Sequence, residues 1–222
     1  MKLFLLLSIL FITDFAPLKN SNQKIYMASV VPVKMSVAKK KERFFHLLVP
    51  AVDKVHGELM TQYEKISKDI KSGKNLQKIK ELKTFYKAKT DKELLSALKP
   101  HRKSITLAQA ALESSWATSR FFIKANNIFG VHSIDENEPR IVAGENKNVW
   151  LKKFDTIEES VRNYYKFIAI GTAYKEFREA RLNKCSIEDT LNELCEYSEI
   201  GEEYPKILNK IILHNNLASY DD

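Results

Sequence analysis

Cysteine, glycine and proline are all scarce in this chain of 222 residues. Only 6 glycines and 6 prolines, set against 44% hydrophobic residues, exclude a loop-rich or disordered protein and favour a globular one. The length suits one compact unit, or one unit with a small extra lobe. The two cysteines, Cys185 and Cys195, flank a capping box, "SIED", that predicts a helix between them. Such a helix would hold the two Cα atoms about 15 Å apart, too far for a disulfide, so we expect two free thiols.

Motifs for binding metals and nucleic acids are missing too. The five histidines form no H-x-x-x-H or H-E-x-x-H pair, so we expect neither a metal nor another cofactor. No motif that reads DNA or RNA is recognisable, and nucleic acid is not among the expected partners. The net charge of +8 instead favours an acidic polymer or an acidic surface.

The hydrophobic run at the N-terminus is short. Residues 1–22 begin with Lys2 and a mostly apolar stretch from Leu3 to Ile12, whereas a membrane-spanning helix needs about 20 apolar residues. A positive start followed by such a stretch predicts a secretory signal peptide, and hence an exported protein of the periplasm or cell envelope. If the segment is not cleaved, it is an N-terminal anchor in contact with the inner membrane. A polar, lysine-rich linker is expected over residues 23–40.

A helical period dominates the part that follows. Apolar residues recur at steps of three and four from Val52 to Ile70, which predicts a long amphipathic helix with Pro50 near its start and Gly73 at its end.

Two shorter helical stretches come next, over residues 76–86 and 94–98, and Pro100 closes the second. We therefore expect residues 41–100 to form an N-terminal helical extension to a main domain over residues 101–217.

One acid, Glu113, lies in the otherwise small and apolar stretch "AALESSW". With Ser104 as its expected N-cap, "ITLAQAALESSWATSRFF" contains neither Gly nor Pro and predicts one unbroken helix. Glu113 falls at the edge of an apolar face that includes Trp116. A carboxyl there loses hydration, which raises its pKa and lets it hold a proton near neutral pH, as the general acid of a glycosidase does. An ion pair with Arg120 on the same edge is the alternative.

A break in the helical pattern follows over residues 131–154. There "RIV" and "NVWLKKF" flank "AGENKN", whose polar residues and Gly suit a hairpin connection. This predicts a two-stranded β-ribbon.

Several separated motifs carry a resemblance to a known family. "ITLAQAALESSWATSRF" followed by "NNIFG" resembles the glucosaminidase family of peptidoglycan hydrolases, which includes the muramidase-like domain of the flagellar protein FlgJ. "FDTIEESVRNYYKFI", "AYKEFREAR" and "YSEIGEEYPKILNKIILHNNL" resemble its bacterial Bax-type branch, and the resemblance covers about residues 41–217. It implies a mainly α, lysozyme-like fold with a small β-hairpin lobe and a groove for peptidoglycan glycan strands.

The resemblance also implies roles for individual residues. Glu113 matches the family's catalytic acid, which protonates the glycosidic oxygen. The expected substrate-binding residues are Trp116, Asn127, Phe129, Gly130 and Tyr164. Structural roles would explain three of them equally well: Asn127 as a turn former, Phe129 as a core residue and Gly130 as a position with positive φ. For Tyr164, core packing and contact with a sugar are equally good interpretations.

A second catalytic carboxylate on the β-ribbon is expected from relatives, but its identity stays open. Glu145 in the turn and Glu138 before the first strand are the candidates, with Glu136 and Asp135 less favoured, and each also suits a solvated loop. A carboxylate about 6.5–9.5 Å from Glu113 predicts inversion, and about 5–5.5 Å predicts a covalent intermediate. In a third route the acetamido group of the substrate attacks its own anomeric carbon.

The hypothesis from the sequence is therefore an endo-β-N-acetylglucosaminidase that cleaves the β-1,4 bond after N-acetylglucosamine in peptidoglycan. A lytic transglycosylase is one alternative, because "ES" on a helix resembles that part of the lysozyme superfamily too. The other is a peptidoglycan-binding scaffold that keeps the groove without strong catalysis.

Overall fold

The computed structural model describes residues 26–32, 34–143 and 148–221. The predicted signal peptide or anchor over residues 1–22 lies outside these ranges and stays a prediction, as does export. Within them, no helix combines the length and the apolar character needed to cross a membrane.

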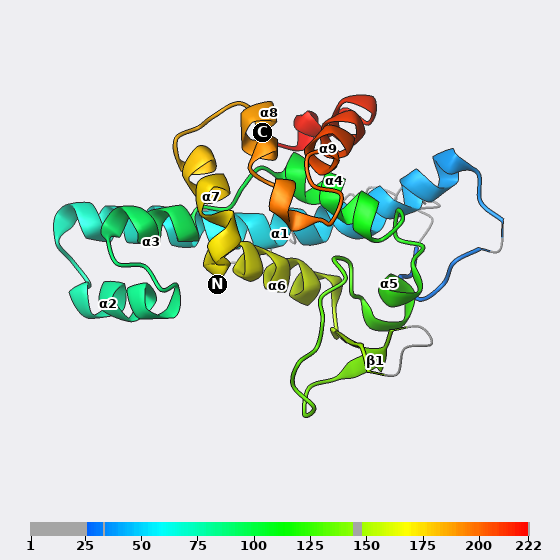
Figure 1. Ribbon diagram of the computed structural model, residues 1–222, viewed down its shortest axis with the longest axis horizontal. Coiled ribbons are helices and arrows are strands. Elements are labelled where there is room, and N and C mark those ends of the chain that lie inside the picture. The colour runs from blue at the N-terminus through cyan, green and yellow to red at the C-terminus, as the bar shows by residue number, and fades with distance from the viewer. Residues whose placement is uncertain (1–25, 33, 144–147, 222) are drawn as a thin grey trace, which may run out of the picture.

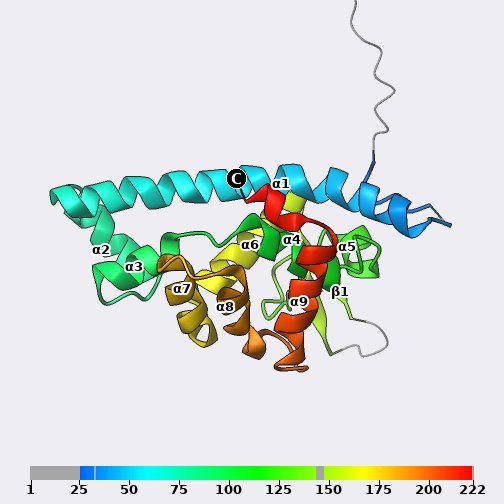
Figure 2. The ribbon, with the colours of Figure 1, turned by 90° about the horizontal axis from the view of Figure 1, so that it is seen from above.

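A 36-residue helix, α1 (Val37–Ser72), runs along one side of the molecule (Figure 2). Ser36 caps its first turn. Gly73 ends the helix at φ 66°, as predicted from the sequence. The prediction that Pro50 lies near its start is wrong, because the helix begins within the stretch expected to be linker. Phe44 and Leu48, both 0% exposed, extend the apolar stripe toward the N-terminus, and their burial outweighs the backbone hydrogen bond that Pro50 cannot make.

Two short helices, α2 (Leu76–Phe85) and α3 (Asp91–Leu98), fold back beside the C-terminal half of α1 (Figures 1 and 2). This end of the molecule has its own small hydrophobic cluster, made of Ile66, Ile79, Leu82, Leu94 and Leu98. The N-terminal half of α1 belongs instead to the main core, through residues such as Leu48 and Val52.

The main core is built around α4 (Lys103–Glu113), whose residues from Ser104 to Ala111 are all buried. The expected amphipathic face is wrong for this helix, because α1, α9 (Glu203–His214) and the 3-10 turn η3 (Leu217–Tyr220) pack on different sides of it. Ser104 is not the N-cap. It lies inside the first turn, where its backbone N–H and its hydroxyl donate to the carboxylate of Asp221 at 2.8 and 2.7 Å.

The described residues form four further helices. They are α5 (Arg120–Ala125), α6 (Ile157–Ile170), α7 (Lys175–Leu182) and α8 (Ile187–Asn192), with 3-10 turns η1 (Thr172–Tyr174) and η2 (Cys195–Tyr197). Helix α6 packs against α1, and α8 against α9.

Both thiols are free, as predicted. The expected continuous helix between Cys185 and Cys195 is wrong, since α8 has only six residues. Ser186 does cap α8: its hydroxyl accepts from the Asp189 N–H at 3.0 Å, and the Asp189 carboxylate reaches back to accept from that hydroxyl at 2.6 Å.

The predicted β-ribbon is confirmed as an antiparallel pair, β1 (Arg140–Val142) and β2 (Trp150–Lys152). Ile141 lies opposite Leu151, and His132 forms an isolated bridge to Leu151 from the other side. The ribbon and its flanking loops make a lobe below the helices in Figure 1. The expected fold class, mainly α with a small hairpin lobe and a helical N-terminal part, is confirmed.

Candidate active site

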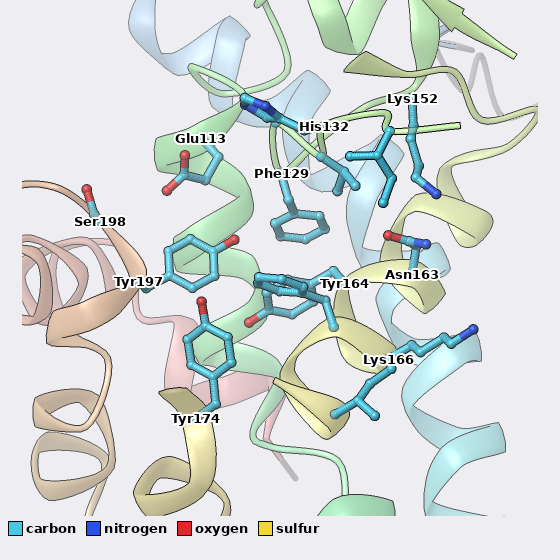
Figure 3. A pocket seen from close by; sticks show the side chains of 15 residues that line it. Glu113, Phe129, His132, Lys152, Asn163, Tyr164, Lys166, Tyr174, Tyr197 and Ser198 are labelled. Atoms are coloured by element: carbon cyan, nitrogen blue, oxygen red, sulfur yellow. The ribbon is translucent and has the colours of Figure 1, made fainter. Parts of the chain in front are cut away.

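A cavity of 770 Å³ lies between the end of α4, the loop that leads to the β-lobe, and α6 (Figure 3). Its walls are rich in aromatic side chains: Phe129, Tyr164, Phe167, Tyr174 and Tyr197. The polar and charged residues that line it include His132, Lys152, Asn163 and Lys166. Flat apolar rings beside a few polar groups suit a ligand such as a sugar, with apolar ring faces and hydroxyl edges.

Glu113 is the last residue of α4 and lines this cavity. Burial raises the pKa of its carboxyl above the ordinary value of 4.5, and a hydrogen bond from Tyr204 opposes part of that rise. Among the described lining residues it is the one carboxylate. The alternative of an ion pair with Arg120 is wrong, because the Arg120 guanidinium donates to the carbonyl of Val142 at 2.9 Å.

The chain turns sharply after Glu113, so the expected unbroken helix is wrong. Ser115, Trp116 and Ala117 all adopt positive φ, at 52°, 60° and 60°. The Ser114 hydroxyl explains the turn, because it donates to the carbonyl of Ala110 and accepts from the N–H of Ala117 at 2.8 Å. The turn ends α4 at the carboxylate and leaves Glu113 on the cavity wall.

Tyr204 and Gln109 are polar residues that the sequence analysis did not select. The Tyr204 hydroxyl donates to Glu113 Oε1 at 2.7 Å, and Gln109 Nε2 donates to the Tyr204 oxygen at 3.1 Å. Tyr204 is 1% exposed and its ring stacks on Tyr197 with a centroid distance of 5.3 Å. The motif "EEYPKIL" contains Tyr204, but a single tyrosine on an amphipathic helix looks like a core residue.

Asn127 is buried and does not line the cavity. Its side-chain amide donates to the carbonyls of Val131 and Lys152, both at 2.9 Å, and its oxygen accepts from the N–H of Val131 at 2.9 Å. These three bonds tie the end of α5 to β2. Asn127 therefore holds the β-lobe in place beside the cavity.

Phe129, Gly130 and Tyr164, three of the expected substrate-binding residues, line the cavity. Gly130 has φ 66°, where any other residue would be strained. The rings of Phe129 and Tyr164 stack with centroids 4.1 Å apart. Tyr164 is only 1% exposed, and its hydroxyl lies 2.9 Å from His101 Nε2. Its ring thus borders the cavity, while its hydroxyl belongs to the interior.

Trp116 does not line the cavity. Its ring packs edge-to-face on Phe44 at 5.1 Å, and the ammonium of Lys41 lies 4.9 Å from its centroid. The structure therefore gives Trp116 a packing position away from the expected substrate.

None of the candidates for a second carboxylate that lie within the described residues lines the cavity. Glu145 lies outside the described residues. Glu138 pairs with Lys152 at 2.7 Å, and this bond lowers the pKa of its carboxyl. Glu136 is within 3.8 Å of Arg140, and Asp135 accepts from the N–H of Asn137 at 2.9 Å.

Metal ligands do not cluster either. In the described ranges no three His, Cys, Asp or Glu side chains come together in a way that could hold an ion.

Comparison with known proteins identifies the family of this chain. Residues 92–217 match the family model described as mannosyl-glycoprotein endo-beta-N-acetylglucosaminidase. The chain belongs to the glucosaminidase family. This confirms the family expected from the sequence motifs.

Two relatives illustrate the match. The chain is 31% identical over 120 residues to the exo-glucosaminidase LytG of Bacillus subtilis (strain 168), covering 50% of this chain and 43% of that protein. It is 32% identical over 114 residues to the protein bax of Escherichia coli (strain K12), covering 47% and 39%. The chain spans less than half the length of either relative.

A solved structure supports the fold alone. An N-acetylmuramoyl-L-alanine amidase from Staphylococcus aureus superimposes with a TM-score of 0.50 at 17% sequence identity, covering 83% of this chain and 44% of that chain.

Proposed function

We propose that this chain hydrolyses the β-1,4 bond that follows N-acetylglucosamine in peptidoglycan, with Glu113 as the general acid. The observation that carries the proposal is a carboxyl with a raised pKa on the wall of an aromatic-lined cavity of 770 Å³. Membership of the glucosaminidase family and the name of the LytG relative support the same chemistry. Such a substrate makes the cell envelope the proposed place of action.

The cavity wall supplies the other parts of the reaction. Protonated Glu113 gives its proton to the glycosidic oxygen as the bond to the anomeric carbon breaks. The aromatic rings pack against the apolar faces of the sugars. Lys166 supplies positive charge that suits the carboxylates of the stem peptides.

The attacking group is proposed to come from the substrate. Glu113 is the one acid among the described lining residues, and Glu138 is held by Lys152 outside that lining. The acetamido oxygen of N-acetylglucosamine then bonds to the anomeric carbon as the leaving oxygen takes the proton from Glu113. Water opens the resulting ring and returns a proton to the Glu113 carboxylate.

Mass spectrometry of fragments released from purified sacculi tests the proposal. The expected products end in a reducing N-acetylglucosamine. Fragments that end in anhydromuramic acid would instead identify a lytic transglycosylase, and binding without release would identify a scaffold. Fragment length decides the mode of attack, because the family model is described as endo-acting and the LytG relative as exo-acting. Long oligosaccharides early in the digest are expected for an endo enzyme.

A further inference from the structure

A line of buried hydrogen bonds leads away from Glu113 into the interior. Glu113 Oε1 accepts from the Tyr204 hydroxyl, and the Tyr204 oxygen accepts from Gln109 Nε2. On the other side of the same amide, Gln109 Oε1 accepts from the Tyr164 hydroxyl. Gln109 therefore connects the hydroxyls of two tyrosines that come from different helices, α6 and α9.

The line continues beyond Tyr164 to a buried cation. His101 Nε2 lies 2.9 Å from the Tyr164 oxygen, and Arg181 Nη1 lies 3.4 Å from His101 Nδ1. Burial lowers the pKa of Arg181 to about 9, which leaves its guanidinium charged at neutral pH. Its other amino group donates to the carbonyls of Ser96 and Ala97 at 2.7 and 3.2 Å.

The two ends of the line set the direction of every bond in it. A guanidinium has no acceptor, so Arg181 must donate to His101 Nδ1. Burial, with smaller contributions from Arg181 and His56, holds the pKa of His101 well below its ordinary value, so its ring is neutral. The one ring hydrogen of His101 is then on Nε2, which lies 2.9 Å from the Tyr164 oxygen and 3.0 Å from the Thr106 hydroxyl oxygen, so that both oxygens can accept from it.

The remaining hydrogens follow in turn. Once its oxygen accepts from His101, Tyr164 is free to donate to Gln109 Oε1, and this contact fixes which side of the Gln109 amide faces Tyr204. The Gln109 N–H occupies the Tyr204 oxygen, and Tyr204 donates onward to Glu113. Every bond points toward the carboxylate.

Solvent has little access to this line. Gln109 is 0% exposed, His101, Tyr164 and Tyr204 are each 1% exposed, and Arg181 is 7% exposed. In a buried line, neighbouring hydrogen bonds polarise one another, and bulk solvent competes little for their partners.

We propose that Gln109 and Tyr164 are positioning residues, which fix the hydroxyl hydrogen of Tyr204 on Oε1 of Glu113 so that the acid proton resides on Oε2. The consequence for catalysis rests on the proposed function, whereas the consequence for the titration of Glu113 does not. Loss of either residue leaves the Tyr204 hydroxyl free to turn. The carboxylate is then less well solvated by its donor, and the pKa of Glu113 rises.

Other groups also face Glu113 and must be kept constant. Tyr204 on α9 and Tyr197 on η2 are its near neighbours, and His132 and Lys152 line the same cavity from the β-lobe. Variants of Gln109 and Tyr164 leave all four in place.

Tyr164→Phe and Gln109→Met in the full chain test the inference. The first keeps the ring that stacks on Phe129 and removes only the hydroxyl, and the second keeps the length of the side chain. Thr190→Val is the matched control, because it removes a buried hydroxyl on α8 whose bond, to the carbonyl of Ser186 at 2.7 Å, shares no residue with the line to Glu113.

The readout is the titration of the Glu113 side-chain carboxyl, followed by carbon NMR. We expect Tyr164→Phe and Gln109→Met each to raise its midpoint by about 0.5 pH unit, and the control to leave it unchanged. The high-pH limb of activity should move the same way, with kcat affected and KM not. Unchanged midpoints in both variants, or an equal shift in the control, would overturn the inference.

The same NMR measurement keeps the two claims separate. If wild-type protein releases nothing from sacculi, the proposed function fails, while the titration still reports on the line. If one variant does not fold, the other one decides, since each interrupts the line at a different bond.

Discussion

Tyr204 on α9 donates a 2.7 Å hydrogen bond to the carboxylate of Glu113 at the end of α4, from 91 positions further along the chain. The bond opposes the effect of burial on the pKa of that carboxyl. Packing of α9 against α4 brings the two residues together. The pKa of Glu113 therefore depends on both helices: α4 holds the carboxyl in a buried position, and α9 supplies its hydrogen-bond donor.

Glu113→Gln should make the protein more stable at neutral pH. The pKa of Glu113 is raised in the folded state, so the folded protein holds this proton to a higher pH than the unfolded chain does. The stabilisation that comes from binding this proton in the folded state is fully present below the ordinary pKa of 4.5. It is lost as pH rises through the higher pKa of the folded state. The neutral Gln side chain does not ionise, so the variant has no buried charge at this position at neutral pH.

Thermal unfolding at about pH 4 and about pH 7 measures this effect. The difference between the melting temperature of Glu113→Gln and that of wild type should be a few degrees more positive at about pH 7 than at about pH 4. A difference that stays constant, or that decreases with pH, would show that burial does not penalise the ionised form.

Asn127→Ala should destabilise the protein by about 2–4 kcal/mol, because three buried hydrogen bonds are lost and the carbonyls of Val131 and Lys152 lose a donor. Denaturant unfolding gives the number. Asn137→Ala is the control, since Asn137 is exposed and its amide bonds only Asp135 among the described residues. Equal losses in the two variants would argue against an anchoring role for Asn127.

Ser115→Gly should stabilise the protein by about 1 kcal/mol, because Ser115 has φ 52° and glycine adopts that backbone without a steric cost. Ser67→Gly, inside the C-terminal part of α1, should destabilise it by about 0.5 kcal/mol. Unfolding midpoints of the pair provide the comparison. A loss of stability in both variants would mean that the turn after Glu113 is not strained.

Glu138→Gln should leave the rate of sacculus digestion within about tenfold of wild type, because its carboxylate pairs with Lys152 and does not line the cavity. Its effect on stability should be at most about 1 kcal/mol, as for other partly exposed ion pairs. A rate as low as that of Glu113→Gln would identify Glu138 as a second catalytic group and contradict attack by the substrate's own acetamido group.

Two elements follow directly from local patterns in the sequence. Apolar residues at steps of three and four predicted the long helix and its end at Gly73, and the polar stretch between "RIV" and "NVWLKKF" predicted the ribbon. Glu113 could be selected from the sequence because a lone carboxyl in an apolar stretch loses hydration, which is unfavourable for its ionised form.

What local patterns missed has physical causes. The turn after Glu113 depends on the hydroxyl of Ser114, and the same residue type is common inside helices. Helix α1 continues across Pro50 because tertiary burial of Phe44 and Leu48 outweighs local propensity. The bond from Tyr204 and the role of Gln109 depend on contacts between helices, which no pattern within one helix records.

The most direct test of the account is the digestion of purified sacculi by wild type and by Glu113→Gln at equal concentration. The account predicts reducing N-acetylglucosamine ends from wild type and a rate about 10²–10⁴-fold lower from the variant, which keeps the wild-type fold. Digestion by Glu113→Gln at the wild-type rate would contradict it.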